Sequence, residues 1–155
     1  MKIGLVLSGG MAKGAYQIGA LRAIDKFIPK EEIFVMSCAS IGVLNGYAYA
    51  TNKLDIAEEI WKNVSENNAR YYINKILKSN LLQFHINNLY DTADVINHKF
   101  YGTLLDVGMK RIVYKNIGDV REEEKKKYLL ACVSLPVYNR SININGNSYY
   151  EYFLY

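Results

Sequence analysis

Ser37-Cys38-Ala39-Ser40-Ile41-Gly42 is the stretch that decides the fold of this chain. It follows a short apolar run, residues 33–36, whose β-branched and aromatic side chains predict a buried strand. It leads into residues 41–50, which contain few helix breakers and predict a helix. A serine held in the abrupt turn between a strand and a helix has its hydroxyl pushed out of the sheet. The stretch therefore predicts a nucleophile elbow with Ser40 as the nucleophile.

The elbow departs from the usual pattern, Gly-x-Ser-x-Gly, at one of its two glycines. Gly42 is the second glycine, but Cys38 occupies the position of the first. Cysteine is small enough for the turn, although it lacks the freedom of glycine at positive φ. We therefore expect Cys38 and Gly42 to flank the nucleophile, with Cys38 acting as a small packed side chain.

A second glycine-bounded turn lies near the beginning of the chain. The continuous apolar run of residues 3–7 predicts a central parallel strand that is buried on both faces. The turn of residues 8–14 follows and opens a helix that runs to about Phe27. Free N–H groups at a glycine turn and a helix N-terminus bind anions. The sequence therefore predicts an anion site directly after the first strand.

Three kinds of anion could occupy this turn, and the glycine spacing separates them. A dinucleotide pyrophosphate requires Gly-x-Gly-x-x-Gly, whereas Gly9 and Gly10 are adjacent. A nucleotide phosphate requires Lys-Ser or Lys-Thr after the last glycine, but Ala15-Tyr16 follows Gly14. The third anion is the oxyanion of a tetrahedral acyl intermediate, which the N–H groups of Gly9, Gly10 and Met11 would stabilise. Consecutive parallel strands usually end at the same rim of a sheet, so we expect this turn to meet the elbow.

At these residues the sequence resembles the patatin-like phospholipase family. The resemblance rests on Leu7–Leu21 and Cys38–Asn45, with a weaker likeness at Ala131–Tyr138, and covers most of the chain. It implies a three-layer α/β/α fold with a mostly parallel central sheet. It also implies a lipid acyl hydrolase that works through a Ser-Asp dyad without histidine. Neither His85 nor His98 follows a strand in a glycine-marked loop, so we expect both to be surface or core residues.

The end of the chain departs most from the family pattern. The family places its catalytic aspartate in Asp-Gly-Gly or Asp-Gly-Ala, whereas the aligned stretch Tyr149–Tyr155 has Glu151 at that position and no glycine. Resemblance therefore implies Glu151 as the base, and Asp106, at the end of a predicted strand, is the alternative. We expect a single domain over residues 1–155 that is incomplete at its C-terminus.

Composition sets the remaining expectations. The chain has 155 residues, with 19 basic and 15 acidic side chains and a net charge of +4. This mild excess is compatible with anionic membrane surfaces but is not typical of nucleic-acid binding. The two cysteines show no metal spacing, and neither a metal nor an organic cofactor is implied. Without a signal peptide or a spanning segment, we expect a cytoplasmic location with peripheral contact with membranes. No pattern predicts an oligomeric state.

Further elements are predicted along the rest of the chain. An amphipathic helix covers residues 52–64, strands cover 100–106 and 111–115, and a helix with a solvated charged face covers 121–134. Asn145-Gly146 joins 140–144 to 147–155 and is the strongest hairpin signal in the sequence. Residues 65–97 predict either helices that cover the core or a cap that contacts membrane or acyl chains.

The sequence leaves three alternative functions open. The first is hydrolysis of a phospholipid or another acyl ester through an acyl-enzyme on Ser40. The second is a non-catalytic relative that binds lipid surfaces or a partner. The third is a phosphate- or nucleotide-binding α/β domain that uses the turn of residues 8–14.

Overall fold

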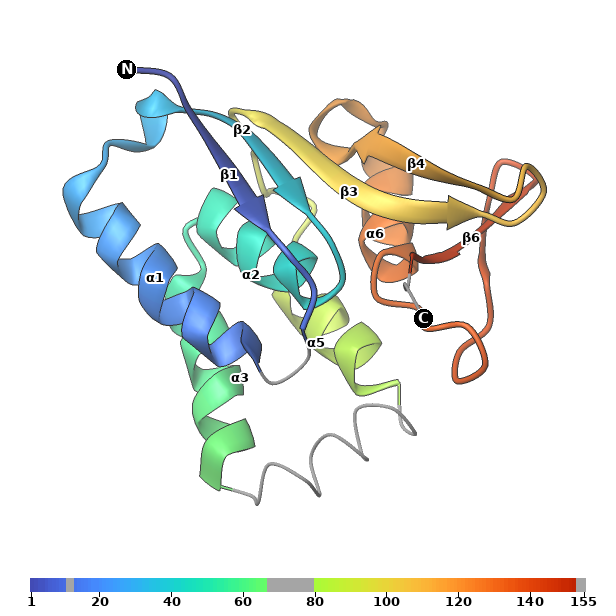
Figure 1. Ribbon diagram of the computed structural model, residues 1–155, viewed down its shortest axis with the longest axis horizontal. Helices are drawn as coiled ribbons and strands as arrows, with labels where there is room; N and C mark the ends of the chain where they lie inside the picture. Colours follow the sequence, from blue (N-terminus) through green and yellow to red (C-terminus); the bar gives the residue numbers. More distant parts are fainter. Residues whose placement is uncertain (11–12, 67–79, 153–155) are drawn as a thin grey trace.

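The computed structural model describes residues 1–10, 13–66 and 80–152, with side chains of 64–66 left undescribed (Figure 1). Its elements follow in chain order: β1 (Ile3–Leu7), α1 (Gly14–Phe27), η2 (Lys30–Glu32), β2 (Ile33–Cys38), α2 (Ile41–Ala50), α3 (Leu54–Glu66), α5 (Leu81–Leu89), β3 (Lys99–Asp106), β4 (Arg111–Asn116), η3 (Ile117–Asp119), α6 (Glu122–Ala131), β5 (Ile142–Ile144) and β6 (Asn147–Glu151). The predicted elements agree with these bounds within a few residues, apart from the predicted helix over 121–134, which ends at Ala131. Part of the predicted segment 65–97 forms α5, and its residues 67–79 lie outside the described residues.

The sheet combines a parallel core with antiparallel additions. Its strand order is β1-β2-β3-β6-β5, and β4 pairs with β3 as well. The neighbours β1, β2 and β3 are parallel, whereas β4 and β6 run antiparallel to β3. Helices flank this sheet (Figure 1). The prediction of an α/β fold organised on parallel strands is confirmed.

Two strands end toward each other along one edge of β3. β2 pairs with the first half of β3, where Cys38 lies opposite Gly102. β6 pairs with the second half, where Glu151 lies opposite Leu104. Both must use the same edge, because β4 pairs with β3 from 101 to 106 and occupies the other edge. The C-terminal ends of β2 and β6 are therefore two β3 residues apart.

Helix α2 lies at the centre of the core. All ten of its residues are buried, because it contacts β1 and β2 on one side and α1, α3 and α5 on others. Helix α6 contacts β3, β5 and β6 farther along the sheet. The burial of α2 explains why its sequence lacks a polar face, and it fixes the position of the residue that precedes the helix.

The prediction that residues 3–7 form a central strand buried on both faces is wrong. In the described sheet β1 is the terminal strand, and its burial alternates, with Leu7 buried and Val6 80% exposed. A run of apolar residues indicates a strand, but it does not determine how many neighbours that strand has. No described strand pairs with the outer edge of β1.

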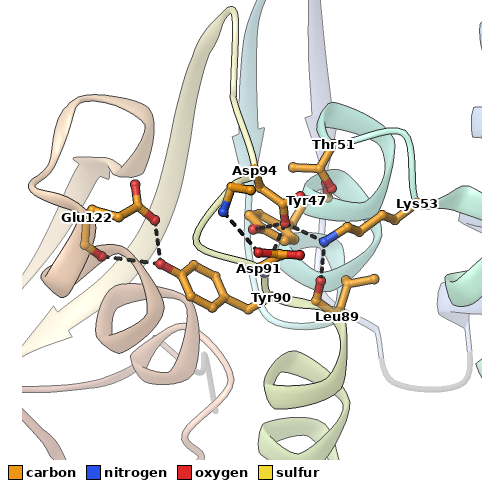
Figure 2. Close-up of polar contacts among 9 residues, drawn as sticks. Tyr47, Thr51, Lys53, Leu89, Tyr90, Asp91, Asp94 and Glu122 are labelled. Atoms are coloured by element: carbon orange, nitrogen blue, oxygen red, sulfur yellow. Dashed lines mark hydrogen bonds and ion pairs between the residues drawn. The ribbon is translucent and has the colours of Figure 1, made fainter.

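A polar cluster ties the ends of α2 and α5 together (Figure 2). The Tyr47 hydroxyl donates to Asp94 at 2.5 Å, and the Lys53 ammonium donates to the same carboxylate oxygen at 2.6 Å. Lys53 also donates to the Leu89 carbonyl at 2.8 Å. Figure 2 shows these side chains converging from separate elements. The cluster fixes the C-terminal end of α2, whereas the predicted elbow lies at the N-terminal end.

Candidate active site

Ser40 occupies a strained turn between β2 and α2. Its backbone has φ 53° and ψ −129°, a combination that non-glycine residues rarely adopt. Such strain costs on the order of 1–3 kcal/mol and persists only where the surroundings hold it. Hydrogen bonds hold it here, from the Gly42 N–H to the Ala39 carbonyl at 2.9 Å and from the Val43 N–H to the Ser40 carbonyl at 2.8 Å. The turn has the geometry of a nucleophile elbow.

The two residues that flank Ser40 in the pattern have different structural roles. A Cβ at Gly42 would lie 2.1 Å from the carbonyl oxygen of Leu7, so only glycine lets α2 approach β1 this closely. Cys38 is buried, and a Cβ at Gly46 would lie 2.7 Å from its sulfur. Burial raises the pKa of the Cys38 thiol far above its usual value, so the thiol stays protonated. Cys38 is therefore a packing residue.

The first glycine turn lies directly against the elbow. A Cβ at Gly9 would lie 3.1 Å from the Cβ of Ser40, and Gly10 has φ 152°. The Gln17 side-chain amide donates to the Ser8 carbonyl at 2.6 Å and holds the turn in place. Met11, the third predicted oxyanion-hole residue, lies outside the described residues. The expected meeting of the two turns is thus found for Gly9 and Ser40.

Glu151 reaches Ser40 from the end of β6. Glu151 is 2% exposed, and the Ser40 side chain lies close enough to act on the pKa of its carboxyl group. Burial raises the pKa of Glu151 to about 7, while the hydrogen bond from Ser40 acts to lower it. The oxygen Oε2 has no hydrogen-bond partner among the described residues. Its backbone N–H donates to the Ser134 carbonyl at 2.9 Å, which fixes the end of the strand.

The other candidate bases have contacts elsewhere. Asp106 accepts a hydrogen bond from the Met109 N–H at 2.9 Å and so organises the turn between β3 and β4. The His98 ring lies 3.1 Å from the sulfur of Met36. His85 is on α5, where its ring packs edge-on against Phe84. Glu151, by contrast, lies where the Ser40 side chain acts on its pKa.

Asn45 is a supporting residue that the sequence reasoning missed. It is fully buried, and its amide donates to the Gly14 carbonyl at 2.9 Å and to the Gln17 side chain at 3.0 Å. It accepts a hydrogen bond from the Trp61 indole at 2.9 Å. A chain of hydrogen bonds therefore runs from α3 through Asn45 and Gln17 to the glycine turn. The available signal was one polar amide within an otherwise apolar helix.

These groups match the three parts that acyl transfer requires. A strained serine hydroxyl, a buried carboxyl group whose pKa is raised to about 7 and a glycine turn lie together, and such a set could act as nucleophile, base and anion site. The described residues include no cluster of three or more histidine, cysteine, aspartate or glutamate side chains that could hold a metal.

Comparison with known proteins finds one family. The sequence model described as patatin-like phospholipase matches residues 5–151. The match begins in β1 and ends at Glu151, so it spans both glycine-bounded turns and the candidate carboxylate. No curated protein matches the chain.

Proposed function

Because the chain belongs to the patatin-like phospholipase family, we propose that it hydrolyses acyl esters of lipids through an acyl-enzyme on Ser40. The observation that carries this proposal is the contact of one strained serine with both Gly9 and Glu151. A family match alone supports a lipid hydrolase in general. The geometry around Ser40 supports the choice of nucleophile and base.

The proposed reaction begins with transfer of the Ser40 proton to the Glu151 carboxylate. The hydroxyl oxygen attacks the ester carbonyl, and the N–H groups of Gly9 and Gly10 stabilise the negative charge that develops on the carbonyl oxygen. Glu151 then returns the proton to the leaving alcohol, which leaves an acyl group on Ser40. Water, activated by the same carboxylate, releases the acid and restores the serine.

The environment of Glu151 suits this role. A base works best when its pKa lies near the working pH, because it is then both ionised and able to accept a proton. Burial raises the pKa of Glu151 to about 7, so the carboxylate is substantially ionised at neutral pH and more basic than an exposed glutamate. Glutamate in place of aspartate therefore leaves a working base in contact with Ser40.

We propose a phospholipid or a related acyl ester as the substrate, met at a membrane surface. Family membership and the net charge of +4 support this choice, since a cationic protein is attracted to anionic headgroups. In the described part of the chain, none of the helices has the length and hydrophobicity that crossing a bilayer requires. Contact of the glycine turn with Ser40 favours an oxyanion over a nucleotide phosphate at that turn.

The proposal is tested by hydrolysis of a short nitrophenyl ester and by labelling with a fluorophosphonate probe. Ser40→Ala should remove labelling and reduce hydrolysis at least 1,000-fold, on the order of the losses seen when a serine nucleophile is deleted. Ser37→Ala is the matched control, because this serine lies in the same stretch but on the strand. An undiminished rate in Ser40→Ala excludes Ser40 as the nucleophile. Absent labelling of the wild type with intact liposome binding would instead identify a non-catalytic lipid-binding relative.

A further inference from the structure

A groove of about 860 Å³ runs between the outer edge of β1 and helix α1. Gly9, which lies against Ser40, is among the residues that line it. From there it passes along α1, where Ala20 and Ile24 line it farther on. The groove therefore borders the candidate active site at Gly9.

The polarity of the groove changes along its length. Its polar side chains, Ser8, Lys13 and Gln17, gather where β1 ends and α1 begins. The opposite end is lined by apolar side chains, among them Leu5 and Ile24. A ligand that matches this pattern has a polar group at one end and a hydrocarbon tail, as an acyl ester does.

We propose that the groove holds the acyl chain of the substrate, with its ester carbonyl at Gly9 and its tail along Ala20 toward Ile24. This inference rests on the proposed function and adds the binding site that selects chain length. From Lys13 to Ile24 the helix rises by about 16 Å. Carbon–carbon bonds of about 1.5 Å advance an extended chain by about 1.3 Å per methylene, so roughly twelve carbons fill the groove.

The main competing occupant is a peptide strand added to the outer edge of β1, with which no described strand pairs. Such a strand would pair with β1 along one side only. Its other side would present N–H and C=O groups to the apolar side chains of Ala20 and Ile24, where they would lose their hydrogen bonds with water. A hydrocarbon chain has no such groups to satisfy, so the lining of α1 favours the acyl chain.

The test compares Ala20→Trp, which fills the groove, with Gly19→Trp. Gly19 is the matched control, because it is the preceding residue of the same helix, it does not line the groove, and a Cβ there would meet nothing within 4 Å. For the wild type, kcat/KM on nitrophenyl esters should rise about twofold per methylene up to about twelve carbons, as expected for a half-buried chain. Ala20→Trp should lower kcat/KM at least tenfold on the dodecanoate ester and only slightly on the butyrate ester. Gly19→Trp should keep the wild-type dependence of kcat/KM on chain length.

Calorimetry of dodecanoate binding in a Ser40→Ala background tests ligand binding in the groove independently of catalysis. Loss of dodecanoate binding in Ala20→Trp supports the groove, even if no ester is hydrolysed and the proposed function fails. Unchanged binding and an unchanged chain-length profile in Ala20→Trp overturn the inference, even if Ser40 is the nucleophile. The inference would also be overturned if the protein forms a dimer that Ala20→Trp dissociates but dodecanoate does not. That result would instead indicate that a strand from a second copy occupies the groove.

Discussion

At the scale of single residues, the candidate site concentrates two unfavourable conditions. Ser40 has a positive φ without being glycine, and Glu151 is a carboxyl group enclosed in the core. Neither condition is stable in an isolated peptide, because each costs free energy that the surrounding packing must offset. A strained residue beside a buried carboxyl group with a shifted pKa is typical of functional sites.

The titration of Glu151 predicts how activity depends on pH. Only the ionised carboxylate can accept the Ser40 proton, so kcat/KM on a nitrophenyl ester should rise with pH with a midpoint near 7. Glu151→Gln should remove this rise and lower kcat/KM at pH 8 at least 100-fold. A wild-type profile that stays flat between pH 5.5 and 8.5 would contradict the role of Glu151 as base.

The same carboxyl group predicts how stability depends on pH. Its pKa is higher in the folded protein than its usual value of 4.5, so the folded state holds the proton more tightly. This stabilisation is complete below about pH 4.5 and is lost as pH rises through about 7, in total on the order of 3 kcal/mol. Denaturant unfolding at pH 5 and pH 8 should show the loss for wild type. Glu151→Gln should show a smaller difference between these pH values, and an equal difference in both proteins would refute the assignment.

At the scale of elements, the site depends on how closely α2 approaches β1. Helix α2 begins directly after Ser40, and the Ala39 N–H donates to the Leu7 carbonyl at 3.0 Å. This contact positions the elbow against the end of β1, where the glycine turn begins. The position of Ser40 relative to the glycine turn is therefore set by backbone packing between two elements.

Substitution of Gly42 tests this packing. The added Cβ of Gly42→Ala would lie 2.1 Å from the Leu7 carbonyl oxygen, so α2 must shift away from β1. We expect a loss of at least about 2 kcal/mol in the free energy of unfolding, as for other overpacked core positions. Gly19→Ala is the control. Its Cβ meets nothing within 4 Å, so higher helix propensity should stabilise α1 by up to about 1 kcal/mol. Equal effects of the two substitutions on urea unfolding would exclude the close approach as the cause.

At the scale of the whole molecule, the candidate nucleophile and the candidate base lie far apart in the sequence. β2 and β6 occupy one edge of β3 and end toward each other, which brings Glu151 to Ser40. The register of β6 depends on the hairpin with β5, in which Asn145 has φ 51° and Gly146 has φ 85°. A change in that turn should therefore act on the distant site.

Gly146→Val tests this dependence. A β-branched residue is strained at positive φ, so the substitution should destabilise the protein by about 1–3 kcal/mol. It should also slow fluorophosphonate labelling of Ser40 at least tenfold under conditions where the protein stays folded, because the register of Glu151 is disturbed. In Asn145→Gly, glycine tolerates the positive φ of this position, so Ser40 should be labelled at nearly the wild-type rate. Normal labelling of a folded Gly146→Val protein would show that the hairpin does not position the base.

The sequence by itself determined the parts of this protein that depend on neighbouring residues. Hydrophobic runs, glycine spacing and the Asn145-Gly146 turn predicted the strands, the elbow and the hairpin, because local backbone preferences act over only a few residues. Only the tertiary structure decided that β1 lies at the edge of the described sheet, that Asn45 links α3 to the glycine turn, and that Glu151 rather than Asp106 meets Ser40. These outcomes depend on which strands pair and in which register, and pairing joins residues that are far apart in the chain. A local pattern carries no information about that choice, which is made by packing the whole core at once.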